Sequence, residues 1–359
     1  MKKMLITLLA VILAVSLLSG CVPKSSSVSP TSDKKNSTPL RVGIMPSAVG
    51  APVQYALEKG YFDEEGVNVE IVIFPSGAPI NEAMAAKQID VACSGAASIF
   101  SLANGTGKLI ADVESSGGMG IWVRPDSDIM TVKGEIAENP EMYGSAETIK
   151  GKTFLATLGT ASQFNVLRYI ERFGLKEGDI KIQSMEFGPA AQAFIAGEGD
   201  AIATFAPYSS QVTEKGAVMC TTFEDATQTA LYDMMFARTD IVESRRDDLV
   251  KFTRAFERAV EDLSNDDVRR EFSMKWFADN GRTYTDDTMT QELHDRRYVT
   301  KETMGTGDYV LGDAMPGYAQ FNVDIGKIEK ENLKNIDSCI DPTILEDAIG
   351  IDIKIPSDK

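Results

Sequence analysis

Histidine and cysteine are scarce in this chain, and each scarcity excludes a kind of chemistry. The 359 residues include one histidine, His294, and four cysteines. A Ser-His-Asp triad would have to use His294, which lies in an acidic and Arg-rich segment that we place far from any cleft. The His and Cys residues lack the spacing of a zinc site, and the chain has neither a phosphate-binding loop nor a dinucleotide fingerprint. We therefore expect no catalytic residue, no metal and no cofactor, and a protein that is not an enzyme.

Basic residues are also in the minority. The chain has 36 Lys and Arg against 53 Asp and Glu, a formal net charge of −17. Without a basic tract, we expect no nucleic-acid partner. After Cys21 only Cys93, Cys220 and Cys339 remain, so at most one disulfide can form, and whether two of them pair is left open.

The N-terminus has the pattern of a bacterial export signal. Lys2 and Lys3 precede an uncharged apolar run from Met4 to Leu18. This run is shorter than the roughly 20 residues of a transmembrane helix. The following Leu-Ser-Gly-Cys resembles a lipobox, which predicts a signal peptide over residues 1–20 and lipidation of Cys21, for example with palmitate. A plain secretory signal is the alternative, and the Ser-rich residues 21–39 are interpreted as a flexible tether.

An internal repeat indicates the architecture. At an offset of 110 residues, the pattern of Pro79–Asp90 recurs at Pro189–Asp200, although a chance match is the alternative. Strands alternate with helices around both copies, which favours parallel sheets with crossover helices. The predicted strands are Arg41–Met45, Asn68–Phe74, Asp90–Cys93, Thr153–Ala156, Asp179–Met185 and Ala201–Thr204, and the predicted helices are Pro52–Lys59, Pro79–Lys87, Ser162–Phe173 and Pro189–Ala196, with others from Gly95 and Pro207.

Beyond Thr239 the pattern changes to amphipathic helices. We expect them over Asp247–Leu263 and Asp267–Asp279. One apolar stripe is interpreted as packing rather than as a ligand site, and it consists of Leu249, Phe252, Phe256, Val260 and Leu263.

Several motifs of the first half carry a family resemblance. The run Leu40–Ile44, the Gly-Tyr-Phe of Gly60–Phe62 and the Asp-Val-Ala of Asp90–Ala92 resemble the solute receptors of ABC importers. The branch that they resemble contains the nitrate, sulfonate, taurine and thiamine-pyrimidine (NMT1-like) receptors. The resemblance covers Leu40 to about Thr239 and weakens beyond it.

The resemblance implies an α/β fold of the two-lobe periplasmic-binding-protein type (type II). Each lobe is expected to contain a mostly parallel sheet with flanking helices, with a cleft between the lobes. The expected division is residues 40–124 for the N-terminal part of lobe 1, 125–235 for lobe 2, and 236–359 for the return to lobe 1 and the C-terminal helices. The crossings between lobes are placed at Ile121–Pro125 and Asp233–Ala237, and residues 126–148 are expected to be loop-rich.

In such sheets, ligands bind beyond the carboxyl ends of the strands, where loops lead into helix N-termini. The loops at these ends are rich in Gly, Ser and Thr, which lets the backbone approach a ligand closely. The alternative is that their hydroxyls only cap helices. We predict ligand contacts at Ser47, Ser76, Ser94, Ser115, Trp122, Thr160, Ser162 and Tyr208.

None of these loops contains Arg or Lys. A multiply charged anion usually draws a bidentate Arg, so we expect a singly charged sulfonate or carboxylate instead. Aromatic residues beside the loops leave a pyrimidine-like ring or a quaternary amine open. Glu224 and Asp225 are a second option for a cationic group, although exposed carboxylates are the commoner explanation.

The predicted function is that of a solute-binding lipoprotein of an ABC importer. It would be extracytoplasmic, anchored to the cell membrane through Cys21 and monomeric, and would deliver a small organic solute to the permease and ATPase subunits. One alternative is an extracytoplasmic ligand sensor. Another is an enzyme resembling the thiamine-pyrimidine synthases, which the export signal and the missing Cys-rich signature disfavour.

Overall fold

The computed structural model describes residues 38–358, apart from residue 116 and residues 230–231. The predicted signal peptide, the lipidation site Cys21 and nearly all of the predicted tether lie outside the described residues. Within the described part of the chain, no helix is both long and apolar enough to span a membrane.

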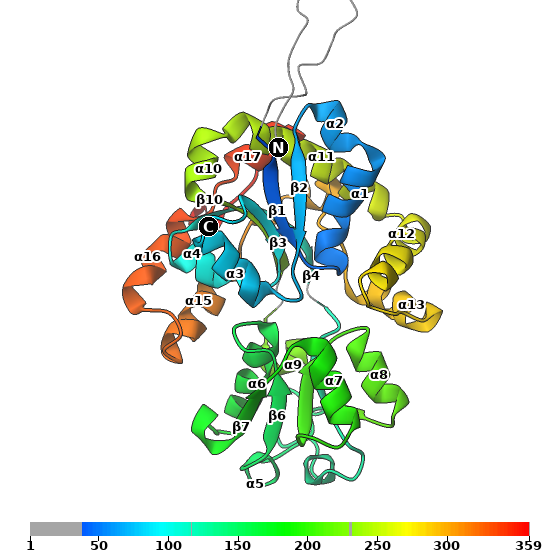
Figure 1. The fold of residues 1–359 in the computed structure, drawn as a ribbon. Coiled ribbons are helices and arrows are strands. Elements are labelled where there is room, and N and C mark those ends of the chain that lie inside the picture. The colour runs from blue at the N-terminus through cyan, green and yellow to red at the C-terminus, as the bar shows by residue number, and fades with distance from the viewer. Residues whose placement is uncertain (1–37, 116, 230–231, 359) are drawn as a thin grey trace, which may run out of the picture. The chain divides into compact units, whose positions relative to one another are not determined.

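The first of two five-stranded sheets has the strand order β2-β1-β3-β10-β4 (Figure 1). Strand β1 runs parallel to β2 and β3, whereas β10 is antiparallel to both of its neighbours. We call this sheet and the helices packed on it the first lobe. Its strands are β1 (Leu40–Ile44), β2 (Val69–Ile73), β3 (Val91–Ser94), β4 (Gly107–Ser115) and β10 (Tyr232–Arg238), and its early helices are η1 (Ala48–Gly50), α1 (Ala51–Lys59), α2 (Tyr61–Glu65), α3 (Gly77–Ala85) and α4 (Ser98–Ala103).

The second sheet repeats this plan with the order β7-β6-β8-β5-β9. Its β6 is parallel to β7 and β8, while β5 is antiparallel to β8 and β9. The predicted α/β class is therefore confirmed, but both sheets are mixed, with two parallel and two antiparallel pairings each, rather than mostly parallel in their pairing. The elements of this second lobe are β5 (Gly120–Val123), η2 (Asp128–Thr131), α5 (Ala146–Ile149), β6 (Thr153–Ala156), α6 (Ala161–Arg172), η3 (Glu177–Asp179), β7 (Lys181–Ser184), α7 (Phe187–Ile195), β8 (Ala201–Thr204), α8 (Tyr208–Glu214), β9 (Val218–Thr222) and α9 (Phe223–Thr227).

The internal repeat has a physical basis in the two aspartates that end it. The carboxylate of Asp90 accepts a hydrogen bond from the backbone N–H of Arg41 at 2.9 Å. The carboxylate of Asp200 accepts one from the N–H of Thr153 at 2.7 Å. In each lobe, the aspartate before the third strand thus satisfies a backbone donor at the start of the first strand, which would otherwise lack a partner.

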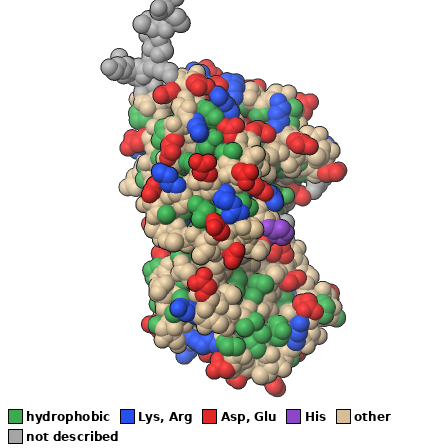
Figure 2. All heavy atoms as spheres, turned by 90° about the vertical axis from the view of Figure 1, so that its right-hand side faces the viewer, with side chains coloured by type: hydrophobic (Ala, Val, Ile, Leu, Met, Phe, Trp, Pro, Cys, Tyr) green, Lys and Arg blue, Asp and Glu red, His purple; other side chains and the backbone are tan. Residues whose placement is uncertain are grey.

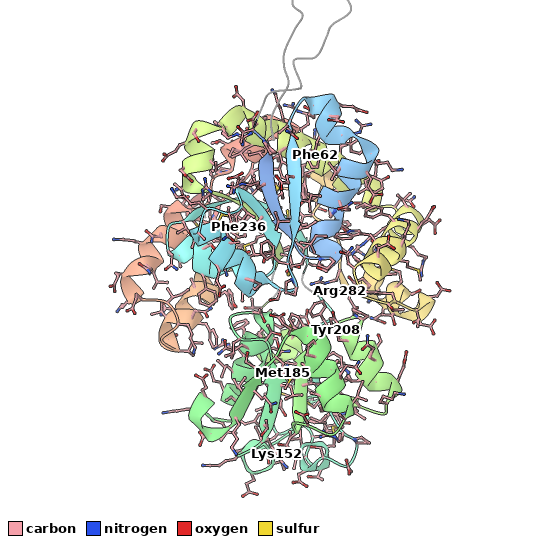
Figure 3. All side chains as sticks on the ribbon, in the orientation of Figure 1. Phe62, Lys152, Met185, Tyr208, Phe236 and Arg282 are labelled. Atoms are coloured by element: carbon pink, nitrogen blue, oxygen red, sulfur yellow. The ribbon has the colours of Figure 1, made fainter. Side chains whose placement is uncertain are left out.

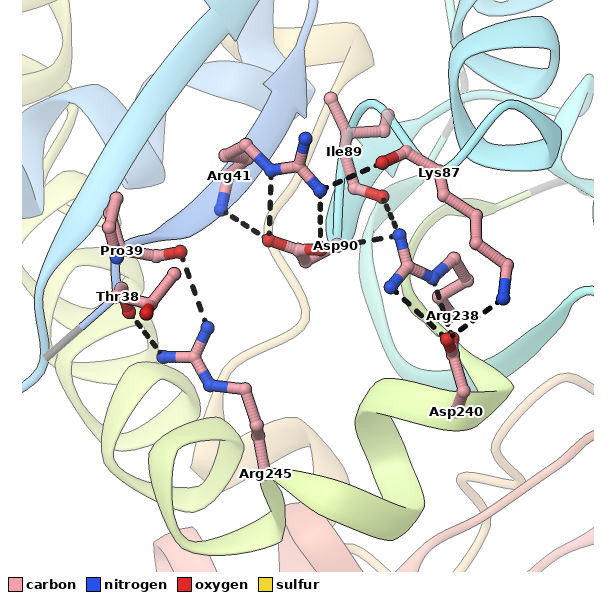
Figure 4. A network of polar contacts seen from close by, with 9 residues as sticks. All are labelled: Thr38, Pro39, Arg41, Lys87, Ile89, Asp90, Arg238, Asp240 and Arg245. Atoms are coloured by element: carbon pink, nitrogen blue, oxygen red, sulfur yellow. Dashed lines mark hydrogen bonds and ion pairs between the residues drawn. The ribbon is translucent and has the colours of Figure 1, made fainter.

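A pair of arginines repeats in the same way. Arg238, at the end of β10, donates from Nη1 to the carbonyl of Ile89 at 3.2 Å and also contacts Asp90 (Figure 4). Arg124, directly after β5, donates to the carbonyl of Gly199 at 2.8 Å. Ile89 and Gly199 are 110 positions apart. In both lobes, an arginine at the end of the antiparallel strand therefore donates to a carbonyl at the same position of the repeat.

The crossings between the sheets differ from the prediction. Ile121–Val123 form β5 inside the second sheet, and Asp233–Ala237 belong to β10 inside the first. The chain passes between sheets after Ser115 and again after α9. The predicted positions are wrong. Both segments are apolar because they are buried in a sheet, and this apolarity does not identify a connection between the lobes.

The chain after β10 packs on the first lobe. Helix α11 contacts α1, α2 and α17, and its predicted apolar stripe from Leu249 to Leu263 is fully buried. The elements here are α10 (Thr239–Ser244), α11 (Arg246–Leu263), α12 (Asp266–Asp279), α13 (Asp286–Asp295), α14 (Lys301–Met304), α15 (Met315–Asp324), η4 (Lys330–Asn332), α16 (Leu333–Ser338), α17 (Thr343–Ile349) and η5 (Pro356–Asp358).

The three described cysteines are all free and buried. Cys93 is fully buried in β3 and behaves as a small core side chain. Burial raises the pKa of its thiol, which disfavours the reactive thiolate.

Glu257 generates a prediction about stability. This α11 carboxyl is 5% exposed and its oxygens have no hydrogen-bond partner among the described residues. Burial, with a smaller contribution from Glu261, raises its pKa to about 8. Since the folded-state pKa lies above the unfolded value, this group favours folding below about pH 4.5 and progressively less up to pH 8.

We therefore expect Glu257→Gln to stabilise the protein relative to wild type by an amount that grows between pH 5 and pH 8. Urea denaturation at several pH values measures this difference. Glu271→Gln, at an exposed position of α12, is the control and should leave the pH dependence unchanged. Equal pH dependence in wild type and Glu257→Gln would contradict the assignment.

Candidate ligand-binding cleft

A cavity of about 50 Å³ lies where the carboxyl ends of the strands of both sheets meet. The general rule for α/β sheets predicts a ligand site at this edge of the sheets. Each lobe contributes loops, and a connection between the lobes contributes Met119. The lining residues are Met45, Ser47, Pro75, Gly77, Gly95, Ala96, Ala97, Met119, Thr160, Ala161, Phe187, Phe205, Phe223, Asp233, Arg282 and Arg296.

Two of the predicted contact residues, Ser47 and Thr160, line this cavity. The hydroxyl of Thr160 donates to the carbonyl of Thr157 at 2.7 Å and accepts from the N–H of Ser162 at 3.2 Å. It therefore caps α6, as the alternative interpretation held. The structure assigns no ligand contact to either residue, so both stay predictions.

Three other predicted serines are buried but do not line the cavity. Ser76 donates to Glu186 Oε1 at 3.1 Å, which joins the loop before α3 to the loop before α7. Ser162 donates to the carbonyl of Ala203 at 2.8 Å, inside the second lobe. The hydroxyl of Ser94 is buried and has no hydrogen-bond partner in the described residues.

The remaining predicted residues lie in three different places. Ser115 pairs with the backbone of Arg297 at the end of β4. Trp122 lines a second cavity, of about 600 Å³. Tyr208 lies at the start of α8 and packs against Phe187 and Phe205, with ring centroids 6.4 and 6.2 Å away.

Sequence reasoning missed the two arginines of the cavity. Arg282 follows the end of α12 and Arg296 follows α13, both in the segment assigned to helix packing. The strand-end loops lack Arg and Lys, as the sequence shows, but two arginines from a later segment of the chain line the cavity. The only local signal was Gly281, which ends α12 with a positive φ of 77°, and such a turn does not show where its neighbour points.

Arg296 is neutralised by buried carboxylates. Its guanidinium lies 3.2 Å from Glu114 and 3.2 Å from Asp233, and Arg269 lies 3.6 Å from Glu114. Burial raises the pKa of Glu114 to about 8 in spite of Arg296, which acts in the opposite direction. Burial lowers the pKa of Arg296, but Glu114, Asp233, Glu292 and Tyr284 together raise it more, so Arg296 stays charged.

Arg282 has a different environment. It is 5% exposed, and its Nη2 donates to the carbonyl of Pro75 at 3.2 Å. Its Nη1 is buried without a hydrogen-bond partner among the described residues. Its guanidinium lies 5.7 Å from the ring of Tyr208, and Figure 3 shows the two side chains next to one another between the lobes. The cavity wall therefore contains a buried guanidinium whose Nη1 has no hydrogen-bond acceptor among the described residues.

His294 lies nearer to the interlobe region than we predicted. It lines the second cavity together with Gly118 and Trp122. Its side chain is 80% exposed and its Nδ1 lies 3.0 Å from Asp295. In the described part of the chain, no group of three or more His, Cys, Asp or Glu side chains could hold a metal ion.

Two lobes of this topology around a cleft are those of the type II periplasmic-binding-protein fold. A similar solved structure is the alkanesulfonate-binding protein SsuA from Xanthomonas axonopodis pv. citri, bound to MOPS. The two share 17% identity with a TM-score of 0.64, over 84% of this chain and 98% of that one.

A model of the NMT1-like family matches residues 33–276, and the chain belongs to this family. A putative ABC transporter periplasmic binding protein from Brachyspira hyodysenteriae is 32% identical over 96% of this chain and 98% of its own length. A putative aliphatic sulfonates-binding protein from Bacillus subtilis is 30% identical over 72% of this chain and 74% of its own length. These likenesses identify an ABC-transporter solute-binding protein, not an enzyme.

The cluster around Arg296 generates a prediction. Arg296→Met leaves the buried carboxylates of Glu114 and Asp233 without their closest cation, so we expect the free energy of unfolding at neutral pH to fall by about 3–5 kcal/mol. Arg297→Met is the matched control, because Arg297 forms an ion pair with Asp266 at the surface, where the expected cost is at most about 1 kcal/mol. Urea denaturation measures both, and similar small losses would contradict the structural role of Arg296.

Proposed function

We propose that this protein captures a small organic monoanion, such as a sulfonate or a carboxylate, and delivers it to the permease of an ABC importer. The observation that carries the proposal is the buried, unpartnered Nη1 of Arg282 in the cavity wall. A buried N–H of a guanidinium without an acceptor is costly, and an anionic solute would supply the missing acceptor.

The preference for a single negative charge rests on Arg282. Arg296 lies within 3.2 Å of Glu114 and Asp233, whereas Arg282 forms no ion pair with a described carboxylate, although the buried Glu292 interacts electrostatically with Arg269, Arg282 and Arg296. One arginine without a paired carboxylate favours a solute with one negative charge. The names of the sulfonate-binding relatives agree with this chemistry.

Both arginines also contact aromatic rings of the second lobe. The guanidinium of Arg282 lies over Tyr208, and that of Arg296 lies 5.5 Å from the centre of the Phe205 ring. Tyr284 adds a hydrogen bond of 3.0 Å from its hydroxyl to the carbonyl of Ala206. A solute bound to Arg282 would thus favour the arrangement in which the lobes meet, which is the coupling that capture by hinge closure requires.

The connections after Ser115 and after α9 are the proposed hinges. Gly117 lies in the first of these connections. A side chain cannot be accommodated at this position, because a Cβ would lie 2.0 Å from the carbonyl oxygen of Asp295. With these hinges, the proposed lobes differ at two places from the predicted division into residues 40–124, 125–235 and 236–359. β5 belongs to the second lobe instead of the first, and the start of β10 belongs to the first lobe instead of the second.

The proposal includes a monomeric, extracytoplasmic protein held at the cell membrane by a lipid on Cys21. The support is the Leu-Ser-Gly-Cys sequence after a short apolar run. A multiply acylated cysteine provides stable anchoring, because each buried methylene contributes about 0.8 kcal/mol.

Arg282 provides the test of the anion site. A thermal-shift screen of short sulfonates and carboxylates identifies a binder, because a ligand at 100 times its Kd adds about 2.7 kcal/mol. Arg282→Gln should then raise the Kd of that binder by about ten- to a hundredfold in calorimetry, as expected for the loss of a hydrogen bond to a charged group. Arg270→Gln, on the outside of α12, should leave the Kd unchanged. An unchanged Kd for Arg282→Gln would refute the site.

Cys21 provides the test of the anchor. In cells that express the full chain, the wild-type protein should sediment with membranes, and Cys21→Ala should appear in the soluble extracytoplasmic fraction. Radioactive palmitate should label only the wild type. Membrane association of Cys21→Ala equal to wild type would rule out a lipid anchor at this residue.

A further inference from the structure

The cavity at Arg282 is too small for an organic anion of ordinary size. Its volume is about 50 Å³, and one ordered water needs about 10–15 Å³ by such a measure. The space accommodates an anionic head group of about four heavy atoms but not a chain attached to it. The rest of the solute must therefore leave this cavity.

A second cavity lies next to the one at Arg282. The second cavity, of about 600 Å³, shares Met119 with the first, and its residue Ala206 directly follows Phe205 of the first cavity. Met119 is unbranched and flexible, so its side chain forms a wall that a ligand can displace. A chain starting at Arg282 would have to displace Met119 to reach the second cavity.

The wall of the second cavity has an apolar part, formed by Met119, Trp122 and Met219, beside polar residues such as Ser209, Ser210, Thr222 and Gln291. Trp122 and Met219 occupy paired positions of β5 and β9, and both line the second cavity. Met219 lies on an edge strand and is 42% exposed. Figure 2 shows hydrophobic side chains gathered on the surface of this lobe. An exposed methionine beside a tryptophan is a contact surface for an alkyl or aryl group.

The rim of the second cavity disfavours a second negative charge. Glu224 and Asp295 both line it. Burial raises the pKa of Glu224, and Asp225 and Asp295 add to this rise. An anionic group at the far end of the solute would meet these carboxylates.

We propose that the cavity lined by Met119, Trp122 and Met219 is a tail subsite, so that the protein selects organic monoanions with an uncharged apolar tail. This inference rests on the proposed anion site at Arg282. It assigns Trp122, predicted from the sequence as a ligand contact, to the tail rather than to the head group.

Linear alkanesulfonates from methanesulfonate to octanesulfonate test the subsite by calorimetry. We expect affinity to increase by up to about fourfold per methylene that becomes buried. Butane-1,4-disulfonate should bind more weakly than butanesulfonate because its second charge meets Glu224 and Asp295. Equal affinities across the series would overturn the tail subsite.

Met219→Asp separates the tail subsite from the head-group site. This exposed substitution should abolish the gain with chain length and leave the Kd of methanesulfonate unchanged. Val218→Asp is the matched control, because Val218 is 37% exposed on the same strand but does not line the cavity, and it should keep the gain. A gain that persists in Met219→Asp would also overturn the proposal.

Tryptophan emission gives an independent signal. The chain has two tryptophans, Trp122 and Trp276, so Trp276→Phe leaves Trp122 as the only one. Octanesulfonate should shift its emission and methanesulfonate should not. If methanesulfonate binds through Arg282 but neither emission nor affinity depends on chain length, only the tail subsite fails. If no alkanesulfonate binds at all, the anion site and the tail subsite fail together.

Discussion

The buried carboxylates of Glu114 and Asp233 need the guanidinium of Arg296, and much of the structure depends on this requirement. Glu114 lies at the end of β4 and Asp233 at the start of β10, beside the two connections between the lobes. Two buried carboxyl groups this close are tolerated only with a cation in contact or with one of them protonated, and the raised pKa of Glu114 favours its protonated form. Arg296 thereby fixes the segment after α13 against both connections and becomes part of the cavity wall.

The fold could be predicted from the sequence because its signals are local and repeated. The pattern ending in Asp90 and Asp200 recurs because the same backbone donor must be satisfied at the start of each first strand. The crossings could not be predicted in the same way. β5 and β10 are apolar like the parallel strands around them, and only pairing with distant strands shows that they lie inside the sheets.

The candidate site was predictable in place but not in chemistry. Strand-end loops identify the cleft, and Ser47 and Thr160 do line it. Serine and threonine at helix N-termini also serve as caps, as Thr160 does, so residue type alone does not separate the two roles. Arg282 and Arg296 come from helix ends far along the chain, where an arginine has no pattern that distinguishes it from a solvated surface residue.

In the proposed function, the position of Arg282 would link recognition to closure through a single side chain. Its Nη2 donates to the carbonyl of Pro75 in the first lobe, its guanidinium carbon lies 5.7 Å from the centre of the Tyr208 ring in the second lobe, and its Nη1 has no hydrogen-bond partner among the described residues. In that proposal, an anion at Nη1 would orient the guanidinium and so favour the contact with Tyr208. By linkage, the contact with Tyr208 increases the affinity for the anion by the same factor. A tail that extends past Met119 would add contacts beside one hinge, so the head group and the tail would both act on the same closing motion.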